Sequence, residues 1–274
     1  MSKEIASDSG HYYTADGTPA YTVIGKNGKE RNTNIKDARQ LGLLPSVTEV
    51  MKVLPKPALI RWMNKQVLMA ALTLTRNEGE SDEAYIDRIM YDAEEHSRQA
   101  SEKGTAIHGA IERRLLGFSV EPEYETLASS AIMALLDHIG TMALLDHIGT
   151  SEWLDFDPEK SFASPLGYGG KVDLHSKPLN FVCDFKTKEF TEETKQLVYD
   201  EQIIQLEAYR HGLGMPTARM INVFISTSVL GLVRVVEHED KDGKYMDVFK
   251  ACLAFWQVLK GYNQRREYVK QDSK

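Results

Sequence analysis

A short hairpin in the second half of the chain constrains the fold more than any other feature of the sequence. Two strand-like stretches, Gly169–His175 and Phe181–Lys188, flank the turn-forming residues Lys177–Asn180. If that turn is symmetric, pairing residues outward from it places Asp173 directly opposite Asp184. Like charges at facing positions repel each other, so this pairing needs something that offsets the repulsion. A divalent cation is the simplest candidate.

The second strand of this hairpin has two different faces, because side chains alternate along a strand. The odd-numbered positions from Phe181 to Phe185 are apolar, and we expect them in the core. The even-numbered positions include Asp184, Lys186 and Lys188. Two carboxylates and a lysine on one strand pair can hold a metal, orient a water and neutralise charge on a phosphate. A lone Asp-x-Lys is more often part of a solvated strand, so this hypothesis needs support from elsewhere in the chain.

Two predicted helices offer that support. His108 and Glu112 are four residues apart and share one helix face, where an imidazole and a carboxylate can both approach a metal. The same spacing is also common in simple hydrogen bonds on helix surfaces. Gln205 and Tyr209 lie along one edge of a later helix, with Arg210 beside them. Their donors suit a phosphate or a nucleic-acid backbone.

Composition excludes several classes of protein. The 274 residues include 33 Lys+Arg and 40 Asp+Glu, and the formal charge of −7 argues against a protein that coats nucleic acid through bulk charge. Two cysteines, Cys183 and Cys252, are too few for a four-cysteine zinc site or iron–sulfur cluster. There is no membrane-length apolar run and no apolar stretch of signal-peptide type near the N-terminus, so we expect a cytoplasmic protein.

The order of the predicted elements indicates an α/β protein with one domain. Its expected parts are an irregular or β lead-in (1–45), a mainly helical part (46–150), an α/β core (151–262) and a charged tail (263–274). Gly104 is expected to break a helix and Thr105 to begin the next one. The expected helices cover about 47–54, 58–75, 81–103, 105–116, 196–213 and 245–262, with a further helical stretch after Pro122. The expected strands cover 152–156, 169–175, 181–188, 218–226 and 232–238.

The helical part contains an exact repeat. Met133–Thr141 recurs unchanged as Met142–Thr150. A step of nine residues turns an α-helix by about half a revolution, so one uninterrupted helix cannot bury both copies on one face. Gly140 is a natural break between them. We interpret the repeat as an in-frame duplication and assign it no role.

Taken in order, the chemical motifs resemble those of the PD-(D/E)xK nuclease superfamily. They are His108, Gly170-Lys-Val-Asp173, Asp184-Phe-Lys186 and Gln205-Leu-Glu-Ala-Tyr209. The resemblance spans about residues 44–210 and is to the RecB-like, phage-type exonuclease branch, in a form without an iron–sulfur cluster. It implies a restriction-endonuclease-like core, in which helices flank a central mixed sheet, with an α-helical N-terminal elaboration.

The resemblance also implies a role for each site residue. Asp173, Asp184 and Lys186 would be catalytic, with Lys186 positioning or helping to activate the attacking water. The ligands of Mg²⁺ or Mn²⁺ would be His108, Asp173, Asp184 and the backbone carbonyl of Phe185, and Glu112 would be a further ligand or a partner of His108. The supporting or DNA-contacting residues would be Gln205, Tyr209, Arg210, Lys188, Arg113, Ser46 and Trp62.

The implied activity is metal-dependent hydrolysis of DNA from linear ends, in phage-type recombination, repair or genome processing. A single-strand annealing or recombination protein is an implied partner. Whether the chain forms a homo-oligomer stays open. A structure-selective or nicking endonuclease would share the same site. A non-catalytic DNA-binding module and a metalloprotein with a structural ion are further alternatives. Lys186 argues against the structural ion, because a cation weakens an adjacent metal site. Strand polarity and the choice between single- and double-stranded DNA stay open.

Overall fold

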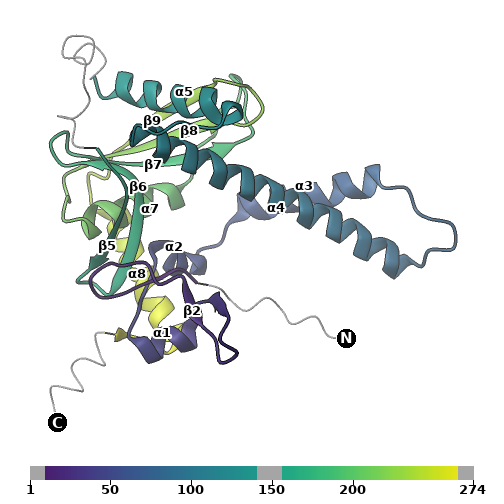
Figure 1. Ribbon diagram of the computed structural model, residues 1–274, viewed down its shortest axis with the longest axis horizontal. Coiled ribbons are helices and arrows are strands. Elements are labelled where there is room, and N and C mark those ends of the chain that lie inside the picture. The colour runs from purple at the N-terminus through teal and green to yellow at the C-terminus, as the bar shows by residue number, and fades with distance from the viewer. Residues whose placement is uncertain (1–9, 141–155, 265–274) are drawn as a thin grey trace.

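A five-stranded mixed sheet forms the centre of the protein (Figure 1). The computed structural model describes residues 10–140 and 156–264. Strands follow the order β5-β6-β7-β8-β9, and only β7 and β8 are parallel, because helix α7 (Asp200–Gly212) connects them. The strands are β5 (Asp157–Ser164), β6 (Tyr168–Ser176), β7 (Phe181–Lys188), β8 (Arg219–Ser226) and β9 (Val233–His238). The expected mixed α/β class is confirmed.

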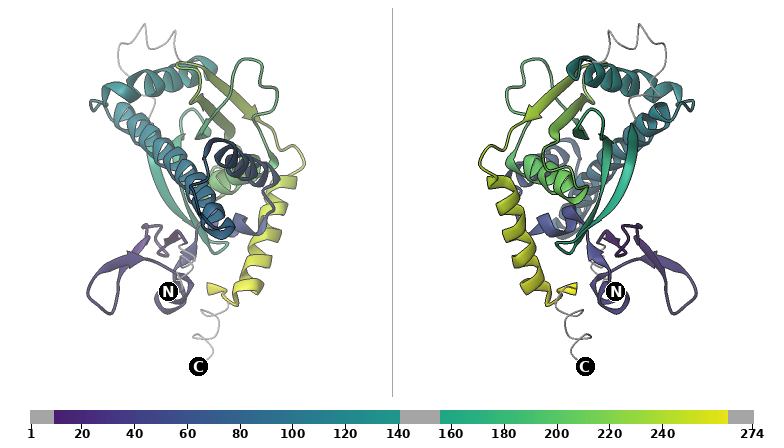
Figure 2. Two further views of the ribbon diagram at one scale, coloured as in Figure 1. Left: turned by 90° about the vertical axis from the view of Figure 1, so that its right-hand side faces the viewer. Right: turned by 90° about the vertical axis from the view of Figure 1, so that its left-hand side faces the viewer.

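Helices cover both faces of this sheet (Figure 2). Helices α4 (Asp82–Leu115) and α5 (Pro122–His138) pack against one face. Helix α7 and helix α8 (Lys244–Lys260) pack against the other. Among the helices that the structure describes, none is both long and apolar enough to cross a membrane.

Strand β7 has the expected apolar face. Phe181, Cys183 and Phe185 are all buried in the cluster under α4 and α5. Val182, at an even-numbered position, is buried in the cluster on the opposite face. Asp184, which also has an even number, is only 2% exposed. The face that the sequence suggested would be polar is therefore largely covered as well, with Asp184 buried and Lys186 and Lys188 partly buried.

The N-terminal lead-in contains more regular structure than expected. Its elements are β1 (Tyr12–Tyr13), β2 (Thr22–Ile24), β3 (Glu30–Asn32), α1 (Ile35–Leu41) and β4 (Leu44–Pro45). Strand β1 pairs with β4, and β2 pairs with β3. Helix α1 was not among the expected elements; it begins at a capping box formed by Asn34 and Asp37. A bridge between Ser46 and Gly169 attaches the lead-in to β6.

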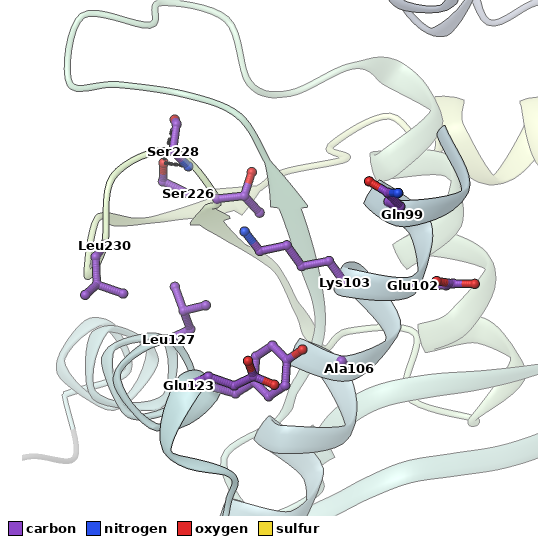
Figure 3. Close-up of a pocket in the computed structure, with 11 residues that line it drawn as sticks. Gln99, Glu102, Lys103, Ala106, Glu123, Leu127, Ser226, Ser228 and Leu230 are labelled. Atoms are coloured by element: carbon purple, nitrogen blue, oxygen red, sulfur yellow. Dashed lines mark hydrogen bonds between the residues drawn. The ribbon is translucent and has the colours of Figure 1, made fainter. Parts of the chain in front are cut away.

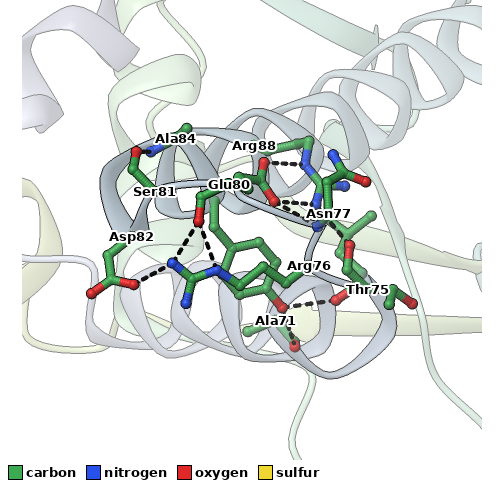
Figure 4. A network of polar contacts seen from close by, with 11 residues as sticks. Ala71, Thr75, Arg76, Asn77, Glu80, Ser81, Asp82, Ala84 and Arg88 are labelled. Carbon is green, nitrogen blue, oxygen red and sulfur yellow. Dashed lines mark hydrogen bonds and ion pairs between the residues drawn. The ribbon is translucent and has the colours of Figure 1, made fainter.

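A helical arm projects from the body of the protein (Figure 1). After α2 (Val47–Val50) and a 3₁₀ turn, η1 (Met51–Val53), helix α3 (Pro57–Thr73) runs outward and the first half of α4 packs along it. A polar network closes the tip of this arm (Figure 4). In it, the Arg88 guanidinium donates to both carboxylate oxygens of Glu80, at 3.0 and 2.9 Å.

The expected break at Gly104 is wrong, because α4 is one continuous helix of 34 residues. The hydroxyl of Thr105 donates back to the carbonyl of Ser101 at 3.1 Å and caps nothing. A Cβ at position 104 would lie 3.0 Å from Oγ1 of Thr187, so the glycine lets the helix approach the end of β7 closely. Packing against the sheet outweighs the roughly 1 kcal/mol that a glycine costs inside a helix.

The first strand of the sheet was also misplaced in the sequence analysis. We expected it at Glu152–Phe156, of which 152–155 lie outside the described residues, but the strand is β5. The sequence did not predict β5, because Pro158 and its charged neighbours are unusual in a strand. A proline is tolerated there because β5 is an edge strand. The first repeat copy ends α5, and Gly140 follows with φ 78°. Thr141, the last residue of the first copy, and the whole second copy lie outside the described residues.

Gly109→Ala tests the continuity of α4. Among the described residues, no atom outside the adjacent residues and the nearby backbone of the same helix lies within 4 Å of a Cβ placed at Gly109, so the extra methyl group meets open space. We expect the substitution to raise the free energy of unfolding by about 0.5–1 kcal/mol, because alanine loses less conformational entropy than glycine in a helix. Urea denaturation measures this change. Gly104→Ala is the matched control and should gain less, because its Cβ meets Thr187. A loss of stability in Gly109→Ala would contradict a continuous helix.

Candidate functional site

The predicted register of the β6–β7 hairpin is correct. Its pairs are Ser176 with Phe181, His175 with Val182, and Leu174 with Cys183. The ladder ends there. Asp173 and Asp184 would form the next pair outward, and at this point the two strands separate. The carboxylates therefore lie at a split in the sheet and not on a continuous ladder.

The Asp173 carboxylate fills this split. Its Oδ2 accepts a hydrogen bond from the backbone N–H of Phe185 at 2.8 Å, in place of the carbonyl that a regular ladder would supply. The pairing of β6 with β5 is interrupted at the same level, opposite Glu159, whose φ of 55° is unusual for a residue other than glycine. His108, from α4, places its Nδ1 3.4 Å from the same Asp173 oxygen. Asp173 therefore joins strand β7 to helix α4.

Asp184 is held by three donors from three elements. The ammonium of Lys186 donates to its Oδ1 at 2.8 Å, and the Gln205 amide donates to the same oxygen at 3.1 Å. The Asn222 amide donates to Oδ2 at 2.8 Å. Gln205 also donates to the Tyr209 hydroxyl at 2.8 Å. The fold thus brings the predicted Gln-x-x-x-Tyr pair of α7 to the Asp-x-Lys motif of β7.

Burial and neighbouring charges give the two carboxylates different pKa values. Burial raises the pKa of Asp184 to about 6; Lys186 opposes this rise and Asp173 adds to it. Burial also acts to raise the pKa of Asp173, but His108 and Lys186 outweigh it, so that pKa is lowered. For His108, burial acts to lower the pKa, and the Asp173 carboxylate more than offsets this, so the net shift is upward. Asp173 is thus the more readily ionised carboxylate.

Two residues of the cluster, Asn222 and His238, were not predicted from the sequence. Asn222 faces Asp184 across the parallel β7–β8 pair and also donates to the Asp184 carbonyl at 3.2 Å. Its own Oδ1 lies 2.8 Å from Nε2 of His238. Since the amide NH₂ donates to Asp184, this oxygen accepts, and His238 carries a proton on Nε2. The only sequence signal was an asparagine inside the otherwise apolar run Met220–Ile225.

Three other predicted residues lie near the cluster without touching it. Glu112 interacts electrostatically with Glu159 and Lys171. Arg113 donates to the carbonyl of Ser119 at 3.0 Å. Lys188 donates to the carbonyl of Leu197 at 2.7 Å, and burial lowers its pKa to about 8. The contact that Lys188 makes secures the segment leading into α7.

The remaining predicted residues have structural surroundings. Arg210 pairs with Glu207, whose side chain is fully buried, and donates to the Ala218 carbonyl at 3.1 Å. Ser46 caps α2 by accepting from the Glu49 N–H at 2.9 Å. Trp62 is half-buried on α3, in the projecting arm. The fold does not bring these three side chains to the Asp173–Asp184 pair.

The donors at the split fit a hard divalent cation in chemical type. Two carboxylates, an imidazole and a strand carbonyl are ligands that Mg²⁺ or Mn²⁺ accepts. In the part of the chain that the structure describes, no three His, Cys, Asp or Glu side chains converge as a formed metal site. Both Asp184 oxygens are instead bound by protein donors. A cation held by Asp173, Asp184, His108 and the Phe185 carbonyl would replace some of these hydrogen bonds.

A separate hollow of about 730 Å³ lies between α4, α5 and the segment that follows β8 (Figure 3). The Lys103 side chain extends from α4 toward Ser226 and Ser228. Lys103 and Ala106 occupy the flank of α4 that is turned away from His108, because successive residues are about 100° apart around a helix. The hollow is therefore distinct from the split in the sheet.

Comparison with known proteins assigns no family to the chain. No protein-family model matches it, and no curated protein matches it. Among solved structures, the crystal structure of SSO0001 is similar at 15% sequence identity and a TM-score of 0.27, over 72% of this chain and 86% of that one. At that level the similarity supports no statement about fold or function.

Asn222→Ala tests the support of Asp184. The substitution leaves a buried carboxylate oxygen and the His238 ring without their partner, so we expect the free energy of unfolding to fall by about 1–3 kcal/mol. The loss should be larger at pH 8 than at pH 5, because the lost donor stabilises the ionised form of a group whose pKa is about 6. Urea denaturation at both pH values measures it. In an Asp184→Asn background the pH dependence should disappear, and equal losses in both backgrounds would contradict the assignment.

Arg210→Ala distinguishes a structural role from DNA contact. The substitution leaves the buried Glu207 carboxylate without its closest partner, and we expect a loss of about 3 kcal/mol or more in the free energy of unfolding. Arg113→Ala, on the exposed surface of α4, serves as the control and should change stability little. If Arg210→Ala keeps its full stability but binds DNA more weakly, Arg210 is a DNA contact.

Proposed function

We propose that this chain is a Mg²⁺- or Mn²⁺-dependent deoxyribonuclease that acts as an exonuclease on linear DNA. The observation that carries the proposal is the split between β6 and β7. There, groups from α4, β7 and α7 contact two carboxylates, of which Asp184 is buried and Asp173 is partly buried. In a solvated hairpin with scattered charges these groups would be exposed, whereas Asp184 is 2% exposed. Burial of a carboxylate pair is costly and is common at sites that carry chemistry.

In the proposed hydrolysis of a phosphodiester, each residue of the cluster has a different role. When bound, the cation supplies Lewis-acid polarisation of the phosphate and a deprotonated water. Asp173 and Asp184 would hold it, together with His108 and the Phe185 carbonyl. Lys186 brings an ammonium to the place where negative charge develops on the phosphate. Gln205 fixes that ammonium, since its Oε1 lies 3.3 Å from Nζ of Lys186.

Two alternatives share parts of this proposal. A structure-selective or nicking endonuclease would use the same residues, and the geometry of the cluster does not separate the two modes. A non-catalytic DNA-binding module would have no use for Lys186 beside the Asp173 and Asp184 carboxylates. A recombination or strand-annealing partner and a homo-oligomer are extensions of the exonuclease proposal, and no described contact bears on them.

Hydrolysis of end-labelled linear DNA tests the proposal. With Mg²⁺ or Mn²⁺ the parent chain should degrade it, and EDTA should abolish the activity. Lys186→Ala and Asp184→Ala should each lower the rate by about 100-fold or more, because each removes a group that stabilises the transition state or holds the metal. Lys177→Ala, in the exposed hairpin turn, is the matched control and should retain the parent rate.

The same assay separates the alternatives. Cleavage of closed circular DNA would favour the endonuclease. DNA binding without hydrolysis under any metal would favour the non-catalytic module. Parent-like rates in Lys186→Ala and Asp184→Ala would show that the site is wrong.

A further inference from the structure

A stack of aromatic rings lies in the N-terminal lead-in. The rings of His11 and Tyr21 stack with centroids 4.6 Å apart and an interplanar angle of 29°. Tyr13 meets Tyr21 edge-on at 5.6 Å, and their hydroxyl oxygens are 2.7 Å apart. Tyr13 is 2% exposed, whereas His11 is exposed. The stack therefore has a fixed inner end and an outer ring open to solvent.

This stack adjoins the candidate site. The Tyr13 ring lies against Gly169 on β6, where an added Cβ would come within 2.7 Å of it, four residues before Asp173. Tyr13 and Tyr21 both interact electrostatically with Tyr209, whose hydroxyl accepts from Gln205. The aromatic stack therefore lies close enough to Tyr209 to interact with it electrostatically, and Tyr209 is linked to Asp184 through Gln205.

Two ion pairs border the stack and present their cationic ends to solvent. Lys52 pairs with Glu49 at 2.7 Å, with side-chain exposures of 46% and 3%. Lys171 pairs with Glu159, with exposures of 37% and 18%. Partial burial and then the charge of Lys52 lower the pKa of His11. The surface beside the site therefore combines an aromatic ring with two ammonium groups.

We propose that His11, Tyr21, Lys52 and Lys171 form a subsite for single-stranded nucleic acid, in which an unpaired base stacks on the His11 ring and the two ammonium groups face adjacent phosphates. This subsite rests on the proposed nuclease function and deepens it, by making a single-stranded segment beside the scissile bond part of the substrate. Every base has a face that can stack on an aromatic ring, so the subsite tolerates any sequence. A base inside a duplex is already stacked on its neighbours, so it gains less free energy from stacking on His11 than an unpaired base does.

Binding of a labelled oligothymidylate to the full-length chain in EDTA tests the subsite, because hydrolysis is then suppressed. His11→Ala should weaken the affinity roughly tenfold, the loss of about one stacked base. His11→Phe, which keeps an aromatic ring, should restore it. His96→Ala removes an exposed histidine from the projecting arm and should bind like the parent. The affinity of His11→Ala for a duplex of the same length should fall less, relative to the parent, than its affinity for the single strand.

A scan with single abasic positions shows whether a base meets the ring. One abasic position should weaken binding by the parent about as much as His11→Ala does, and should have little further effect in that variant. Tyr21→Leu should reproduce the His11→Ala loss, and its unfolding curve checks that it is folded. If His11→Ala and Tyr21→Leu bind the oligothymidylate as tightly as the parent while the parent hydrolyses DNA, the subsite is wrong and the nuclease function stands. If the parent neither binds nor hydrolyses DNA, both proposals fail.

Discussion

The hydrogen bond from the Phe185 N–H to the Asp173 carboxylate is the interaction on which the rest of the site depends. In a regular antiparallel ladder a backbone carbonyl would accept this N–H. A carboxylate in its place ends the pairing of β6 with β7 and brings a negative charge into the sheet beside Asp184. Asp184 is almost fully removed from water and the Asp173 side chain is only 17% exposed, and such burial costs several kcal/mol for an ion unless partners offset it. The surrounding elements supply those partners.

Each neighbouring element approaches the split closely enough to contribute one polar group. Helix α4 brings His108, and the absence of a side chain at Gly104 permits that approach. Helix α7 brings Gln205, and β8 brings Asn222. An apolar core of the same volume would be at least as stable as this set of buried charges. The presence of these charges is better explained by a chemical role than by a contribution to stability. The nuclease proposal therefore rests on the split.

The sequence predicted what local rules determine and missed what long-range packing determines. The register of the three pairs nearest the turn followed from turn symmetry, but the predicted facing pair Asp173–Asp184 did not form, because the Asp173 carboxylate accepts the Phe185 N–H there. The break at Gly104 was wrong because glycine propensity is a local signal, whereas close packing on β7 decides the helix. Asn222 was missed because it meets Asp184 across 38 residues and a parallel pairing, which no local pattern reveals. Arg210 follows Tyr209 in sequence, but one residue turns a helix by about 100°, toward Glu207.

The depth of the charges explains how an acidic chain is compatible with a nucleic-acid substrate. The formal charge of −7 counts every ionisable side chain equally. Around the site, however, the carboxylates of Glu49, Glu159 and Asp184 lie deeper than the lysines that pair with them. A phosphate at the surface meets the ammonium groups first, because charge close to solvent and to the ligand dominates its interaction. Bulk charge therefore argues against a protein that coats nucleic acid, but not against one that holds a single strand at a small, locally cationic surface.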